Sequence, residues 1–227
     1  MYRDRREAGR RLAEAMAGLK GTHPLVLAVP RGGAPMARVI ADALEGELDV
    51  VLVRKIGAPG NPEFAIGAVS EDGSVHLEEE ASHVTDAWLA REVAHQRELI
   101  EERRRRYTPV RSPIDPADRC VVVVDDGSAT GATMAAALAT LRQRRPARLI
   151  AALGVASREA LGRLEALADE VVCPEAPSHF MAVGQFFAHF DPVEDADVIE
   201  LLASRQGRDG ATSAEGGPPL EGGGPRH

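Results

Sequence analysis

The feature that most constrains the fold of this chain is a set of short, wholly apolar segments separated by helical patterns. The segment VVVV at 121–124 is the clearest, and LVLAV at 25–29 has the same character. Side chains of a strand point alternately to its two faces, so a strand that is apolar on both faces must be covered on both sides. The pattern predicts an α/β fold with a mostly parallel central sheet flanked by helices.

The order of the segments supports this fold, because strand and helix patterns alternate along most of the chain. The predicted strands are 25–29, 49–53, 120–124, 148–153 and 170–173. The predicted helices are 4–19, 36–44, 84–106, 131–144, 157–167 and 195–203. Glycine and proline predict a loop over 56–64, and a hairpin is predicted after it, turning at 71–74.

One domain accounts for most of the chain. We expect it to span residues 1–203, with a small C-terminal hood over about 174–203 that holds four of the five phenylalanines. Residues 204–227 are rich in glycine and have too few apolar side chains to form a core, so they are predicted to be a disordered tail.

Composition excludes several functional classes. The chain has 227 residues, 44% of them hydrophobic, with a net charge of −8. This balance disfavours a nucleic-acid or membrane-surface binder, which needs a basic face. No apolar run approaches the roughly 20 residues that span a bilayer, and the charged N-terminus lacks the apolar core of a signal peptide. We therefore expect a soluble cytoplasmic protein.

Polar segments follow the ends of three predicted strands. They are Arg31–Gly33, Arg54–Lys55 and Asp125–Thr133. Ligands of open parallel sheets bind beyond the carboxyl ends of the strands. In the third segment, small residues let backbone amides approach an anion, which the N-terminus of the next helix also favours. The acidic pair would repel a phosphate but suits sugar hydroxyls or a divalent metal. The segments together fit a sugar phosphate with anionic groups at two ends.

These segments resemble motifs of the type I phosphoribosyltransferases. VVVVDDGSATGAT at 121–133 is similar to that family's signature for phosphoribosyl pyrophosphate (PRPP). VPRGG at 29–33 resembles the family's pyrophosphate loop, and VRKIGAPGNPEFAIGAV at 53–69 resembles the strand and flexible loop that follow it, notably in the adenine-type enzymes. The three motifs occur in the family's order, and the resemblance spans about residues 20–190.

The resemblance implies a role for each motif. Asp125 and Asp126 would bind the ribose 2′ and 3′ hydroxyls and, together with Arg31, act in catalysis. The residues implied for the 5′-phosphate are Gly127, Ser128, Ala129, Thr130, Gly131 and Thr133. Those implied for the pyrophosphate are Arg31, Gly32, Gly33 and either Arg54 or Lys55. The family often has a cis peptide in this loop, which would be Pro30–Arg31. Mg²⁺ would bind through PRPP oxygens and water, near the acidic pair but with no direct protein ligand.

The acceptor of the phosphoribosyl group stays open. Ala129 occupies the position where the 6-oxopurine enzymes carry an acidic residue, which argues against a hypoxanthine–guanine activity. Phe186 or Phe187 in the hood could stack on a base, although packing against the core is the interpretation that we favour for either one.

Two functions are compatible with these motifs. The first is Mg²⁺-dependent transfer of the phosphoribosyl group from PRPP to a nitrogenous base, with release of pyrophosphate. The alternative is a regulator that senses PRPP or a nucleotide on the same fold without catalysis. The basic residues and the candidate lid over 56–64 favour the enzyme. We expect no nucleic-acid or membrane partner, and the fold allows a homodimer.

Overall fold

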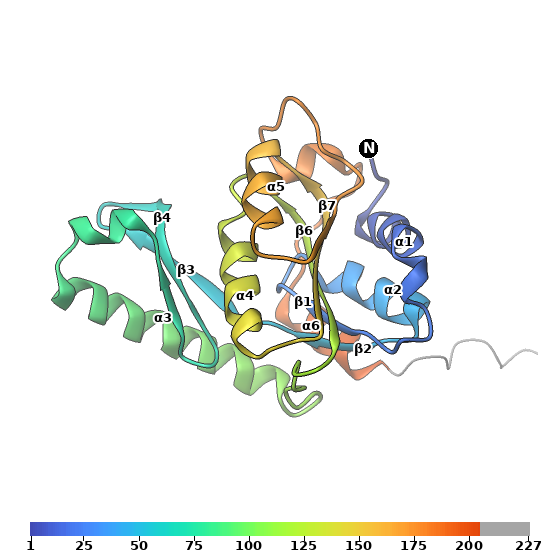
Figure 1. Ribbon diagram of the computed structural model, residues 1–227, viewed down its shortest axis with the longest axis horizontal. Coiled ribbons are helices and arrows are strands. Elements are labelled where there is room, and N and C mark those ends of the chain that lie inside the picture. Colours follow the sequence, from blue (N-terminus) through green and yellow to red (C-terminus); the bar gives the residue numbers. More distant parts are fainter. Residues whose placement is uncertain (205–227) are drawn as a thin grey trace, which may run out of the picture.

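A five-stranded parallel sheet forms the centre of the molecule, as the apolar segments predict (Figure 1). The computed structural model describes residues 1–204, apart from the side chains of Pro62 and Glu63. The strand order is β2-β1-β6-β7-β8. Its strands are β1 (Leu25–Ala28), β2 (Glu47–Val50), β6 (Cys120–Ser128), β7 (Arg148–Ala156) and β8 (Glu170–Val172).

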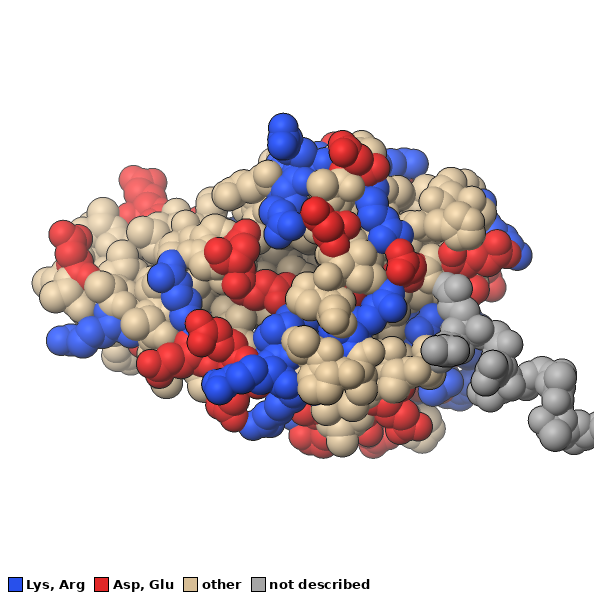
Figure 2. Space-filling model, turned by 90° about the horizontal axis from the view of Figure 1, so that it is seen from below, with Lys and Arg blue, Asp and Glu red and all other residues tan. Residues whose placement is uncertain are grey.

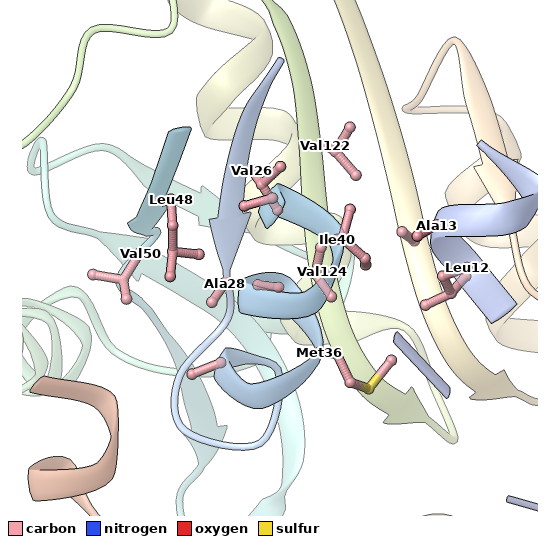
Figure 3. Packing of buried hydrophobic residues seen from close by; sticks show 14 of the residues in the cluster. Leu12, Ala13, Val26, Ala28, Met36, Ile40, Leu48, Val50, Val122 and Val124 are labelled. Carbon is pink, nitrogen blue, oxygen red and sulfur yellow. The ribbon is translucent and has the colours of Figure 1, made fainter. Parts of the chain in front are cut away.

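Helices cover both faces of this sheet, and each strand contributes side chains to both sides. The helices are α1 (Arg5–Ala15), α2 (Ala34–Leu44), α3 (Asp86–Tyr107), α4 (Ala132–Gln143), α5 (Arg158–Glu165) and α6 (Asp195–Ala203). Val122 and Val124 pack with Met36 of α2 on the face that α1 and α2 cover (Figure 3). Val121 and Val123 pack on the opposite face, which α4 and α5 cover. The predicted α/β sandwich is confirmed.

A second, antiparallel sheet extends from the body and corrects two predictions. It consists of β3 (Val53–Ala58), β4 (Asn61–Ser70) and β5 (Val75–Leu77). The strand predicted over 49–53 ends at Val50, so Arg54 and Lys55 belong to β3 in this second sheet. The loop predicted over 56–64 is mostly strand. Its glycines and prolines are typical of loops, but here they accompany a tight turn at Gly60 (φ +77°) and a register shift near Gly57.

Helix α3 packs along the second sheet, and the two form an arm that projects to one side of the body (Figure 1). An ion network, buried at Asp49, joins the arm to the body. Arg104 of α3 pairs with Asp49 of β2 (3.4 Å) and with Glu71 after β4 (2.6 Å). Asp49 is 1% exposed and also accepts hydrogen bonds from the amides of Val50 and Ile114. We call Asp49, Glu71 and Arg104 the arm anchor.

The C-terminal segment before α6 is irregular. It contains one of three short 3₁₀ segments, Val183–Phe186; the others are Ala17–Leu19 and Glu79–His83. Helix α6 has the bounds that the sequence predicts. The prediction of a disordered tail falls on residues 205–227 and, except for Ser204, lies outside the described part of the chain. Within residues 1–204, no helix is both long and apolar enough to cross a membrane.

Candidate active site

Strand β6 carries the acidic pair and continues beyond it. Gly127 and Ser128, predicted in the loop, pair with Val155 and Ala156 of β7 as part of the strand. A Cβ on Gly127 would lie 2.6 Å from the carbonyl oxygen of Val155 and 2.8 Å from the side chain of Val183, so only glycine fits there. The strand is longer than predicted because its small residues allow β7 and the C-terminal segment to approach closely.

The turn between β6 and α4 is short and internally hydrogen-bonded. The amide of Gly131 donates to Ser128 Oγ (2.8 Å), and Gly131 itself has a φ of +74°, which favours glycine. The hydroxyl of Ser157 donates to the carbonyl of Ala129 (2.5 Å). Thr130 lies at the tip of the turn, and Thr133 lies in the first turn of α4. The amino end of α4 therefore meets the end of β6, where a helix N-terminus favours an anion.

The loop after β1 presses against the acidic pair. The Pro30–Arg31 peptide bond is cis, which confirms the expectation from the resemblance. A Cβ on Gly33 would lie 2.3 Å from the carbonyl oxygen of Val124. One on Gly32 would lie 2.1 Å from Asp126 Oδ2, so any larger residue would collide with that carboxylate. Two motifs that are far apart in the sequence thus meet at one edge of the sheet.

Burial disfavours the charged forms of Asp125 and Asp126, and the pKa values of the two carboxyls are affected differently. Burial raises the pKa of Asp125 well above its ordinary value, and the neighbouring charge of Asp126 raises it further. One Asp125 oxygen accepts the amide of Asp126 (2.9 Å). Burial also raises the pKa of Asp126, but the guanidinium of Arg5 opposes that rise. Asp126 is therefore the more readily ionised carboxyl of the two.

Arg5 belongs to the site, and sequence reasoning missed it. Its Nε lies 2.9 Å from Asp126 Oδ2, and its Nη1 donates to the carbonyl of Asp191 (2.7 Å). Its guanidinium carbon lies 3.8 Å from the centre of the Phe190 ring. In the sequence, Arg5 is one of several arginines on a charged N-terminal helix, and nothing local distinguishes it from the others.

The expected hood is tied to the N-terminus. Tyr2 and Phe187 form a parallel bridge, in which the amide of Tyr2 donates to Phe186 and its carbonyl accepts from Ala188, each at 2.8 Å. Phe187 is 5% exposed and packs on the Tyr2 ring at 5.3 Å, so the packing interpretation is confirmed for this residue. Phe186 is half-buried and stacks on Phe180 with 5.6 Å between the ring centres.

The basic residues predicted for the pyrophosphate are spread out. Arg31 pairs with Glu194 at the start of α6 (2.5 Å), and both side chains are exposed. Arg54 Nε donates to Gln96 of α3 (2.6 Å), and Arg54 lines a small cavity that Pro30 also lines. Lys55 follows on β3, and successive side chains of a strand point to opposite faces. The structure therefore brings Arg54 close to the loop after β1.

Three further observations bear on ligands. Within residues 1–204, no group of three or more His, Cys, Asp or Glu side chains is arranged to hold a metal ion. A cavity of about 620 Å³ lies between α3, α4 and the β4–β5 hairpin, and its lining contains none of the predicted site residues. Acidic and basic side chains are interspersed on the face seen in Figure 2, without a continuous basic patch.

Comparison with known proteins identifies the family. The model of the family described as "Phosphoribosyl transferase domain" matches residues 2–189. The chain belongs to this family. The phosphoribosyl transferase domain is 40% identical to the Mycobacterium tuberculosis protein named "Putative phosphoribosyl transferase Rv0571c", over 97% of this chain and 51% of that protein. The chain thus spans about half the length of this curated relative.

Solved structures resemble the domain as well. It is similar to TT1426 from Thermus thermophilus, with a TM-score of 0.81 and 50% identity over 89% of this chain and 98% of that one. It is more distantly similar to a purine phosphoribosyltransferase from Pyrococcus horikoshii, with a TM-score of 0.42 and 16% identity over 77% and 89% of the two chains.

Proposed function

We propose that this domain transfers the phosphoribosyl group of PRPP to a nitrogenous base and releases pyrophosphate. One observation carries the proposal: the glycines of the cis-peptide loop press on Asp126 and on the end of β6, next to the N-terminus of α4. This places groups suited to pyrophosphate, ribose hydroxyls and 5′-phosphate around a single edge of the sheet.

The chemistry follows from the charges of these groups. The amides of the turn 127–131 and the amino end of α4 would bind the 5′-phosphate, with the hydroxyls of Thr130 and Thr133. Asp126 and Asp125 would accept hydrogen bonds from the ribose hydroxyls. As the C1–oxygen bond to pyrophosphate breaks, positive charge develops on the ribose, and the carboxylates stabilise it. Arg31, with Gly32 and Gly33, would bind the departing pyrophosphate, while the nitrogen of the base forms the new bond to C1.

Magnesium fits this arrangement as an ion carried by the substrate. Within residues 1–204 no set of three or more side chains is arranged to hold a metal ion, so PRPP oxygens and water would coordinate the ion near the acidic pair, with no direct protein ligand. The ion would neutralise charge on the pyrophosphate. Arg31 must exchange Glu194 for the pyrophosphate, and because that ion pair is exposed, its loss is inexpensive.

The base would bind under the C-terminal segment. The stacked pair of Phe180 and Phe186 offers a half-buried aromatic surface. Ala129 offers no acidic group to a 6-oxopurine. We therefore propose recognition mainly by stacking and by backbone groups, with adenine and the pyrimidines as the first acceptors to try.

The test is an assay of pyrophosphate release from PRPP and Mg²⁺ with a panel of adenine, hypoxanthine, guanine, uracil and orotate. We expect release with at least one base, and a loss of roughly 10²–10³-fold in Asp126→Asn. Asp118→Asn is the matched control, because Asp118 is exposed and lies outside the site. PRPP binding without release from any base would assign the sensing function instead. Absence of PRPP binding would refute both functions.

A further inference from the structure

We propose that Arg5 is a positioning residue: it holds Asp126 in place and ionised for the ribose hydroxyls, and it ties the C-terminal segment to the acidic pair. The ribose part of this inference rests on the proposed function, whereas the link between Arg5 and Asp126 does not. Arg5 lies outside all three motifs and comes from the first turn of α1.

Three contacts fix the Arg5 guanidinium. It binds Asp126 Oδ2 at 2.9 Å and the carbonyl of Asp191 at 2.7 Å, and it lies over the ring of Phe190 at 3.8 Å. The side chains of Arg5 and Asp126 are 11% and 13% exposed, so water screens the pair weakly. A planar guanidinium can make an ion pair, a backbone hydrogen bond and a ring contact at once, which an ammonium group does less well.

The ion pair leaves Asp126 able to bind a hydroxyl. Arg5 holds Oδ2, the same oxygen that faces Gly32. Among the side-chain hydrogen bonds described for residues 1–204, the one that reaches the Asp126 carboxylate is that of Arg5, and it does not occupy Oδ1. Arg5 thus fixes the carboxylate through Oδ2, beside backbone amides of Asp126 and Gly127, and a carboxylate has enough lone pairs for a ligand hydroxyl to bind as well. A carboxylate accepts a hydroxyl more strongly when it is ionised, so its protonation state matters.

The charges around Asp126 explain why it needs Arg5. Burial favours the protonated form of Asp126 and raises its pKa. Arg5, from α1, is the charged group that opposes this rise, and hydrogen bonds from the backbone amides of Asp126 and Gly127 oppose it as well. Asp125 is the adjacent acidic residue on β6, and burial raises its own pKa. The C-terminal segment faces the pair through the Phe190 ring and the Asp191 carbonyl, and the loop after β1 faces it through Gly32. Without Arg5, the carboxyl would hold its proton to higher pH.

Arg5 also joins two parts of the chain that close over the site. The backbone of residues 2–3 already pairs with residues 186–189, through bonds that include His189 to Arg3 at 2.8 Å. The side chain of Arg5 adds contacts with Phe190 and Asp191 to this backbone pairing, and it also binds Asp126. Orientation of the acidic pair and closure of the C-terminal segment are therefore coupled through one side chain.

The first experiment measures the PRPP dissociation constant with Mg²⁺ by calorimetry between pH 5.5 and 8.5. Arg5→Gln should weaken binding at neutral pH by roughly 10–100-fold, as expected for loss of a buried charged partner. Its affinity should also begin to fall at a higher pH than that of the wild type. Arg5→Lys should restore the pH dependence while recovering only part of the affinity. Arg6→Gln, an exposed neighbour on the same helix, is the control. An unchanged pH dependence in Arg5→Gln would overturn the inference.

A double-mutant cycle asks whether Arg5 acts through Asp126. If it does, Arg5→Gln made in an Asp126→Asn background should change PRPP affinity by less than about threefold, because its partner is already neutral. Independent, multiplicative losses would show that Arg5 acts elsewhere and would overturn the inference.

A third measurement separates this inference from the proposed function. The carboxyl of Asp126 can be titrated by carbon-13 NMR in the free protein, with Asp126→Asn to assign the signal. The pKa of Asp126 should be higher in Arg5→Gln than in the wild type, whether or not PRPP binds. If the wild type does not bind PRPP, the proposed function fails, and this titration still decides the role of Arg5: an unchanged pKa overturns it.

Discussion

Replacing Asp125 by asparagine should make the free protein more stable and the enzyme less active. Asparagine keeps the shape of the side chain and an oxygen that can accept the amide of Asp126, which now lies at 2.9 Å. It removes a charge that burial and Asp126 both disfavour. Sites built to bind a ligand often retain such unfavourable charges at a cost to stability.

The sign of the effect follows from the direction of the pKa shift, and each tenfold change in acidity sets the scale of its size. Between its ordinary value of 3.8 and its higher value in the folded state, Asp125 binds a proton more often when folded than when unfolded. Its contribution to stability is therefore lost as pH rises through the folded-state pKa. A tenfold weaker acidity corresponds to about 1.4 kcal/mol. For a domain of this size, that amount alone changes Tm by about 3–6 °C.

Calorimetry of the free protein at pH 3.5, 6 and 8 tests this reasoning. The Tm of Asp125→Asn should exceed that of the wild type at pH 8, and the difference should shrink at pH 3.5, where the carboxyl is mostly protonated in both states. Asp169→Asn is a control of opposite sign, because hydrogen bonds from Arg142 and the amide of Leu149 hold the pKa of Asp169 below its ordinary value. Turnover of Asp125→Asn should fall by roughly 10²–10³-fold. An Asp125→Asn Tm at or below the wild-type value at pH 8 would refute the argument.

Three other substitutions probe the site and its supports. Gly32→Ala places a methyl group against the carboxylate of Asp126, so PRPP affinity measured by calorimetry should fall at least tenfold, with about 1–3 kcal/mol of stability lost to overpacking. Arg104→Met leaves the buried carboxylate of Asp49 without its charged partner, and urea unfolding should show a loss of about 3–5 kcal/mol. Phe187→Ala should destabilise the fold by about 3–5 kcal/mol, because its ring is buried in the core. Phe186→Ala should chiefly raise the KM for the base. The reverse result would make Phe186 the packing residue and Phe187 the residue that stacks on the base.

Local patterns were enough to predict the central sheet and its helices. The valines of 121–124 alternate between two cores, and helix 195–203 has the bounds that its pattern predicts. The meeting of the loop after β1 with the acidic pair at the carboxyl edge also follows from the sequence, since parallel strands end on the same side. Gly32 lies close to Asp126 because β1 and β6 are neighbours in the sheet.

Features that depend on contacts between residues far apart in the chain could not be predicted from the sequence. The strands β3 and β4 include or flank Gly57 and Gly60, because a register shift accommodates the first glycine and a left-handed turn the second. Glycine and proline are common in loops, so the local sequence indicated a loop rather than two strands. Arg5 lies 121 residues from its partner, Asp126, and the pairing depends on how α1 is placed by the bridge between Tyr2 and Phe187. No periodicity in the N-terminal helix encodes that placement.

Two of the charged groups expected to bind PRPP have partners from outside the motifs. Arg31 pairs with Glu194, and Asp126 pairs with Arg5. The first pair is exposed and the second is nearly buried, so they should respond differently to a ligand. The exposed pair can exchange easily, freeing Arg31 for pyrophosphate. The buried pair resists separation, because breaking it would leave a charge without a partner in a poorly solvated place. A ribose would therefore bind to the Arg5–Asp126 pair as a unit rather than replace Arg5.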